Sequence, residues 1–297
     1  MKIMKGIIHL LLVVIGALLI FFVLNQAIPK EQARLEPVVA SDKDSDKKPK
    51  VHYVAIGDSL TEGIGDQTNR GGFVPIVADD IQSRYNLTSV EVENYGVAGE
   101  RSDQILKRMK KDTSIQENLK SADFITLTVG GNDLMKVIQD NFFGLTIKTF
   151  NKPIKKYQAR VTELLDEIRT LNQQAPIYVL GIYNPFYLNF PEITDMQTIV
   201  DNWNAATEKA LTEETSAYFI PINDLLYQGL DDKVGITSEL EETDNSSSEG
   251  NKLSIVDNNV LYDGDKFHPN NIGYQLMANT VRDELIKTQD EWIKEQN

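Results

Sequence analysis

Apolar runs of strand length alternate along this chain with segments whose apolar positions recur at helical spacing. Residues that fit strands are 51–57, 89–96, 124–131, 177–183 and 217–222. Residues that fit helices are 73–85, 102–111, 154–172, 195–215 and 270 to about 293. Several of the strand segments are continuous runs rich in valine and isoleucine, which is typical of strands buried on both faces. The alternation predicts an α/β domain with a parallel sheet covered by helices.

The longest apolar run lies near the start of the chain and predicts a membrane anchor over residues 1–29. Lys2 and Lys5 precede 18 mostly apolar residues, 7–24, a length that just spans a bilayer. Residues 25–27 fit a cleavage site poorly, so we favour an uncleaved signal anchor over a cleaved peptide. Because the lysines should stay in the cytoplasm, we expect a single-pass protein of the cell membrane with an extracytoplasmic domain. The alternative is secretion after cleavage.

Two polar segments flank and interrupt the predicted domain, which covers residues 51–297. Residues 30–50 are polar and charged, and we interpret them as a flexible tether between membrane and domain. Residues 230–253 are acidic, rich in serine and poor in apolar residues. We expect them to form an exposed insertion with little fixed structure.

The net charge and the lack of cysteine reduce the classes of function that are open to this chain. The formal net charge is −14 at pH 7, which argues against nucleic acid as a partner because phosphate binding needs a basic face. We interpret the basic cluster at residues 107–112 as a solvated helix face. The chain has no cysteine, which excludes disulfides, thiolate catalysis and cysteine-based zinc sites.

Ser59 is the first candidate for chemistry because it follows an apolar run in the stretch AIGDSLTEGIGD, residues 55–66. A serine hydroxyl is a poor nucleophile unless a base removes its proton, and histidine suits that task near neutral pH. The chain has three histidines. His9 lies in the predicted membrane segment, and His52 lies at the opposite end of the strand from Ser59. His268 remains as the candidate base.

Further candidates complete a site for acyl transfer. Asp265 stands three residues before His268, where it can accept a hydrogen bond from the imidazole and fix its tautomer. The backbone N–H of Gly99 and the side-chain amide of Asn132 are donors for a developing oxyanion. Both follow predicted strands, as Ser59 does, and ligands bind beyond the carboxyl ends of strands in such folds. Taken alone, each segment is also typical of an ordinary turn or helix cap.

Four blocks taken together resemble the SGNH branch of the GDSL hydrolases, and the resemblance spans about residues 51–286. The blocks are GDSL at 57–60, NYGVAG at 94–99, GGND at 130–133 and DGDKFHP at 263–269. The resemblance implies a flavodoxin-like three-layer α/β/α domain with a five-stranded parallel sheet. It implies no metal and no cofactor.

The resemblance also implies a role for each candidate residue. Ser59 would attack an ester carbonyl, His268 would act first as base and then as acid, and Asp265 would orient His268. The backbone N–H groups of Ser59 and Gly99, together with the side chain of Asn132, would hold the oxyanion.

The segment NPFYLNFPE, residues 184–192, is unusually aromatic for a loop that follows a strand. We hypothesise that aromatic side chains here wall an acyl pocket or form a membrane-facing lip. The residues concerned are Tyr183, Phe186, Tyr187 and Phe190. The alternative is that these rings simply pack on the helix layer.

Three functions are consistent with these observations. The leading hypothesis is a membrane-tethered serine ester hydrolase, a lipase or esterase that includes the lysophospholipase-like case, acting on a small-molecule or lipid ester. The second keeps the same triad but makes the protein an O-acetylesterase of cell-wall glycans. The third is a non-catalytic surface binding domain, which would not need such a set of residues. We expect a monomer that contacts the membrane through its N-terminal helix.

Overall fold

The computed structural model describes residues 49–141, 145–185, 195–227, 229 and 258–293. The predicted anchor at residues 1–29, nearly all of the predicted tether and the predicted insertion at 230–253 lie outside the described residues. Among the helices that are described, none has both the length and the apolar character needed to cross a membrane.

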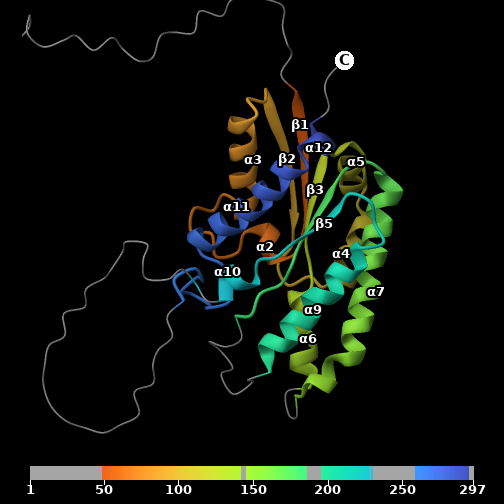
Figure 1. Ribbon diagram of the computed structural model, residues 1–297, viewed down its shortest axis with the longest axis vertical. Helices are drawn as coiled ribbons and strands as arrows, with labels where there is room; N and C mark the ends of the chain where they lie inside the picture. Colours follow the sequence, from red (N-terminus) through yellow and green to blue (C-terminus); the bar gives the residue numbers. More distant parts are fainter. Residues whose placement is uncertain (1–48, 142–144, 186–194, 228, 230–257, 294–297) are drawn as a thin grey trace, which may run out of the picture. The chain divides into compact units, whose positions relative to one another are not determined.

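Five parallel strands form one sheet, as the apolar runs predict (Figure 1). They are β1 (Lys50–Gly57), β2 (Ser89–Gly96), β3 (Phe124–Thr128), β4 (Ile177–Leu180) and β5 (Ala217–Ile220). Their order is β2-β1-β3-β4-β5, and each neighbouring pair is parallel. β2 lies on one side of β1 and β3 lies on the other, so the direction in which successive strands are added reverses at β1. This is the switch point beyond which ligands bind in open α/β sheets.

Helices cover both faces of the sheet and complete three layers (Figure 1). One face carries α4 (Ser102–Lys111), α5 (Thr113–Ser121), α6 (Gly131–Asp140), α7 (Ile147–Leu171) and α9 (Met196–Leu211). The other carries α3 (Phe73–Arg84), α10 (Asn223–Tyr227), α11 (Asn271–Lys287) and α12 (Gln289–Trp292). Successive strand residues point to opposite faces, so Val54 and Ile56 are buried in one core and Tyr53 and Ala55 in the other.

Two helix predictions need correction. The helix predicted over residues 154–172 begins earlier, at Ile147, and contains Pro153. A proline usually ends or kinks a helix, so the sequence favours a later start. The last predicted helix is divided at Thr288, whose hydroxyl donates to the carbonyl of Glu284 at 2.8 Å. Helices α5 and α6 were not predicted.

Arg108 corrects part of the interpretation of the basic cluster at residues 107–112. The lysines of this cluster are exposed on α4, but the guanidinium of Arg108 lies 2.8 Å from the carboxylate of Glu100. It also donates to the carbonyl oxygens of Gly57 at 3.3 Å and Tyr95 at 3.1 Å. Arg108 therefore ties α4 to the carboxyl ends of β1 and β2, instead of facing only solvent.

Candidate active site

Ser59 lies at the carboxyl end of β1, as the first residue of the short helix α2 (Ser59–Glu62). Asp58 caps this helix because its Oδ1 atom accepts a hydrogen bond from the N–H of Leu60 at 3.1 Å. Gly57 is required before the cap, since a Cβ atom there would lie 2.2 Å from Oγ1 of Thr128. The backbone thus turns sharply from strand to helix and leaves Ser59 nearly buried, with 9% of its surface exposed.

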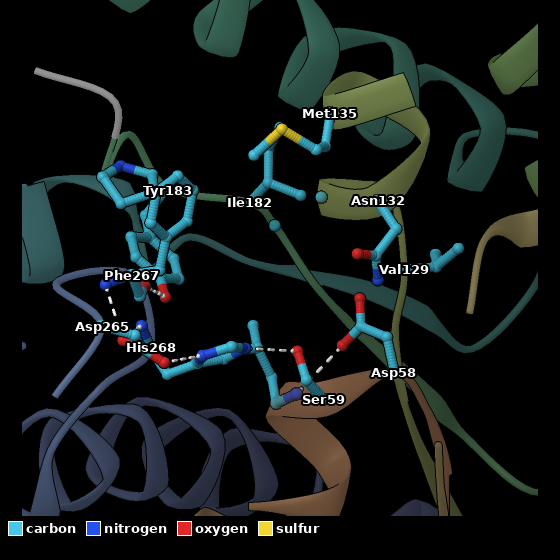
Figure 2. A pocket seen from close by; sticks show the side chains of 14 residues that line it. Asp58, Ser59, Val129, Asn132, Met135, Ile182, Tyr183, Asp265, Phe267 and His268 are labelled. Atoms are coloured by element: carbon cyan, nitrogen blue, oxygen red, sulfur yellow. Dashed lines mark hydrogen bonds and ion pairs between the residues drawn. The ribbon is translucent and has the colours of Figure 1, made fainter. Parts of the chain in front are cut away.

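A hydrogen-bonded relay joins Ser59, His268 and Asp265 (Figure 2). Nε2 of His268 lies 2.9 Å from Oγ of Ser59, and Nδ1 of His268 lies 2.6 Å from Oδ2 of Asp265. Three side chains that the sequence analysis selected from two distant segments therefore meet. Their order is that of a nucleophile, a base and a group that orients the base.

Asp265 also fixes the backbone of the loop that carries His268. Its Oδ1 atom accepts the N–H groups of Phe267 at 2.8 Å and His268 at 3.0 Å. Partial burial acts to raise the pKa of Asp265, but the hydrogen bonds from His268 and Phe267 outweigh it and hold the pKa below its ordinary value. The carboxylate is therefore kept ionised beside the imidazole.

The base loop, defined here as residues 260–270, closes on itself through backbone contacts. The N–H of Tyr262 donates to the carbonyl of His268 at 2.7 Å, and Leu261 pairs with Pro269 in an antiparallel bridge. The loop also packs tightly on the turn after α2. A Cβ atom on Gly65 would lie 2.5 Å from the carbonyl oxygen of Pro269 and 3.2 Å from Cβ of His268.

The two predicted oxyanion donors differ in their placement. Asn132 lies in the first turn of α6, lines the same cavity as Ser59, and donates through Nδ2 to the carbonyl of Glu100 at 3.0 Å. Its amide carries a second hydrogen that remains for a ligand. Gly99 occupies an exposed turn with φ of +80°, and it does not line the cavity.

Two carboxylates hold the turn that contains Gly99. Glu62 of α2 accepts the N–H of Ala98 at 2.5 Å, and Asp133 of α6 accepts the N–H and hydroxyl of Ser102. The turn after β2 is thereby connected to α2, which follows β1, and to α6, which follows β3.

A cavity of about 350 Å³ opens beside the Ser59 hydroxyl. Apolar groups from the residue that follows β3, from α6, from the segment after β4 and from the base loop supply much of its wall (Figure 2). These residues are Val129, Met135, Ile182, Tyr183, Pro185 and Phe267. The described residues that line this cavity include no lysine or arginine, and its carboxyl groups belong to Asp58 and Asp265.

Asp58 is an unusual part of this wall because it is a carboxyl group with only 4% of its surface exposed. Burial raises its pKa, while hydrogen bonds from Thr128 and the backbone of Leu60 act in the opposite direction. The hydroxyl of Thr128 donates to Oδ1 of Asp58 at 2.8 Å. The residue thus binds β1, α2 and β3 together directly beneath the nucleophile candidate.

Of the aromatic residues named in the hypothesis about the segment after β4, the structure describes Tyr183, which lines the cavity. Phe186, Tyr187 and Phe190 lie outside the described residues. The sequence analysis missed Met135 and Ile182. Met135 could have been found, because it lies one helical turn after Asn132 and so shares its face of α6.

Comparisons with known proteins show which sequences and structures this chain resembles. Residues 55–276 match the model of the GDSL-like Lipase/Acylhydrolase family. The uncharacterized protein YpmR of Bacillus subtilis (strain 168) is 36% identical over 247 residues, which cover 82% of this chain and 86% of that protein. The spore germination lipase LipC of Bacillus licheniformis is 26% identical over 238 residues, covering 78% of this chain and 95% of that protein.

Solved structures share the fold. The lipase Lip_vut3 from a goat rumen metagenome superposes with a TM-score of 0.57 and 23% identity, covering 78% of this chain and 96% of its own. A mutant of Axe2, an acetyl-xylooligosaccharide esterase from Geobacillus, gives a TM-score of 0.52 and 18% identity, covering 83% and 99%.

Proposed function

This chain belongs to the GDSL-like lipase/acylhydrolase family as an ester-hydrolysing enzyme, and we propose that it acts through an acyl-enzyme formed on Ser59. In this proposal His268 is the general base and acid, and Asp265 orients it. The observation that carries the proposal is the relay of 2.9 Å and 2.6 Å that joins the three side chains. A non-catalytic binding domain would not need this relay.

The relay suggests the following steps. Oγ of Ser59 attacks the ester carbonyl carbon while Nε2 of His268 takes its proton. The tetrahedral intermediate collapses, the proton on Nε2 passes to the leaving alcohol, and the acyl group stays on Ser59. A water molecule then attacks the acyl-enzyme with His268 again as base, which releases the acid and restores the serine. Each proton that leaves a nucleophile thus returns to a leaving group.

We propose three donors for the oxyanion, and they differ in the support that the structure gives them. The backbone N–H of Ser59 and the side-chain amide of Asn132 are supported by their position at the cavity. Gly99 stays a predicted third donor, because its turn adjoins the site through Glu100, whose carbonyl accepts from Asn132.

The cavity supports an acyl group longer than acetyl. Its volume of about 350 Å³ lies within the range of about 300–1,000 Å³ that is usual for small-molecule sites, whereas an acetyl group would fill only a small part of it. Burial of an acyl chain against these apolar side chains is favourable by about 25 cal/mol for each Å² of apolar surface removed from water. We therefore propose esters of medium-length, uncharged acyl chains as substrates, in preference to the acetyl groups of glycans.

Placement outside the cytoplasm is proposed from the sequence alone. The lysines and apolar run within residues 1–29 support a membrane anchor with the catalytic domain on the extracytoplasmic side. Protease added to intact cells should then digest the domain. Digestion only after lysis would contradict this orientation.

The catalytic proposal is tested by assaying the full-length, detergent-solubilised chain on p-nitrophenyl esters of increasing acyl length and on acetylated xylo-oligosaccharides. We expect kcat/KM to be highest at medium chain length and to fall roughly 10⁴-fold or more in Ser59→Ala. A fluorophosphonate should label the parent chain on Ser59. Unchanged turnover in Ser59→Ala would overturn the assignment, and a strong preference for the acetylated glycan would favour the carbohydrate esterase.

A further inference from the structure

Tyr183 connects the end of β4 to the base loop. It lies three residues beyond the end of the strand, is only 8% exposed, and forms part of the cavity wall (Figure 2). Its hydroxyl donates a hydrogen bond to the carbonyl oxygen of Phe267, the residue just before His268. One side chain therefore contacts both the space for a ligand and the backbone next to the candidate base.

The bonded carbonyl belongs to the peptide unit that also contains the N–H of His268. That N–H donates to Oδ1 of Asp265 at 3.0 Å, the carboxylate whose other oxygen lies 2.6 Å from the imidazole. Because a peptide unit is planar and rigid, fixing its carbonyl also fixes the direction of its N–H. The tyrosine hydroxyl thereby acts on the geometry between Asp265 and His268 without touching either side chain.

Most of the hydrogen bonds that shape this loop run within it. The carboxylate of Asp265 accepts from Phe267 and His268, and the N–H of Tyr262 donates to the carbonyl of His268. These bonds define the shape of the loop but do not orient it on the sheet. The bond from Tyr183 does, because Tyr183 extends directly from β4. Burial raises the pKa of the Tyr183 hydroxyl well above its ordinary value, so the group remains a donor at working pH.

We propose that Tyr183 is a positioning residue that holds His268 in line with Ser59 by anchoring the Phe267–His268 peptide unit to the end of β4. The proposal rests on the assignment of His268 as the base. In this proposal the hydroxyl of Tyr183 positions the base loop, whereas its ring only forms part of the cavity wall. Deleting the hydroxyl should therefore impair the chemical step while leaving the apolar wall in place.

Tyr183→Phe tests the proposal, with Tyr178→Phe as the matched control. Tyr178 lies in β4, five residues before Tyr183, is fully buried, and pairs its hydroxyl with Oγ1 of Thr288 at 2.6 Å. Both changes remove one buried hydroxyl from one tyrosine, so their effects on thermal unfolding should be similar. Only one of the two hydroxyls contacts the base loop.

Both variants and the parent full-length chain are assayed for kcat and KM on one medium-chain p-nitrophenyl ester. The rate at which a fluorophosphonate labels Ser59 is measured for each of the three proteins. We expect Tyr183→Phe to lower kcat by about 10- to 100-fold, the range for a small misplacement of a catalytic group. KM should stay within about threefold because the ring remains. Labelling of Ser59 should slow in parallel, and Tyr178→Phe should leave kcat unchanged.

Unchanged kcat in Tyr183→Phe would overturn the inference, and so would an equal loss in Tyr178→Phe or a loss confined to KM. These results differ from a failure of the proposed function. In that case the parent chain itself would lack ester hydrolysis that depends on Ser59, whatever residue occupies position 183.

Discussion

The carboxylate of Asp133 accepts two hydrogen bonds from Ser102, one from the backbone N–H at 2.9 Å and one from the hydroxyl at 2.6 Å. Asp133 follows Asn132 at the start of α6, and Ser102 begins α4 just after the turn that contains Gly99. The pair therefore joins two of the loops that surround the proposed oxyanion site.

The environment of Asp133 predicts that the stability of the fold depends on pH. Burial raises its pKa, and the hydrogen bonds from Ser102 offset this only in part. Because the folded-state pKa lies above the unfolded-state value of about 3.9, the folded chain binds this proton more tightly. The resulting contribution to the free energy of unfolding is fully present below about pH 3.9 and is lost as pH rises through the folded-state pKa.

Asp133→Asn should remove that dependence. Urea unfolding measured from about pH 4 to about pH 8 should show the variant gaining stability relative to the parent as the pH rises. Asp140→Asn, which changes an exposed carboxylate on the same helix, is the control and should show no such trend. A difference between Asp133→Asn and parent that is constant with pH would contradict the prediction.

Asp265→Asn should retain the fold but lose most of the activity. The amide preserves size, yet it can hold the imidazole in the wrong tautomer and no longer stabilises the imidazolium formed during attack. We expect kcat to fall by about 10³- to 10⁴-fold on a p-nitrophenyl ester, with KM changed far less. A loss smaller than about tenfold would show that Asp265 does not orient the base.

Gly99→Ala separates a donor role from a purely conformational one. Gly99 has φ of +80°, and a Cβ atom there would meet no other atom within 4 Å, so the strain lies in the backbone alone. Gly71, with φ of +106° and no contact to an added Cβ atom shorter than 3.4 Å, provides the matched control. Both alanine variants should lose about 1–3 kcal/mol of stability.

The kinetic results of these two variants should differ if Gly99 donates to the oxyanion. Gly99→Ala should then lower kcat by about tenfold or more, because a shifted donor stabilises the transition state less. Gly71→Ala should not. Equal kcat values in the two variants would remove Gly99 from the site and leave Ser59 and Asn132 as the donors.

Met135→Phe should shorten the preferred acyl chain. Met135 lines the cavity from α6, and a larger, stiffer ring there leaves less room beyond the reacting carbonyl. We expect the ratio of kcat/KM for an octanoyl ester to that for an acetyl ester to fall about tenfold, within the range for hydrophobic pockets. The acetyl ester is the internal control. If both esters lose equally, the acyl chain does not bind beside Met135.

Most of the fold could be predicted because each strand of the sheet has a strong local signal. β2 matches its predicted bounds at both ends, and β1 differs only by including Lys50. Helix α5 escaped prediction because it follows α4 at once, with Asp112 ending the first helix and capping the second. No polar linker separates the two, so the sequence shows no boundary.

The relay could be predicted because few residues were able to serve. With three histidines in the chain, elimination alone selected His268. Apart from Tyr183, the apolar wall of the cavity could not be predicted, because Val129 and Ile182 lie just beyond the ends of β3 and β4 and their direction depends on how these strands pack. Arg108 was misjudged for the same reason, since only the folded sheet brings Gly57 and Tyr95 within its reach. The proposed roles of Phe186, Tyr187 and Phe190 stay predictions.

The bond between Ser59 and His268 spans 209 positions of the sequence. Only the assembled sheet brings the end of β1 and the base loop together, so unfolding of the domain separates the two side chains. Modification of Ser59 that depends on His268 would consequently report the fraction of molecules in which the whole domain is intact.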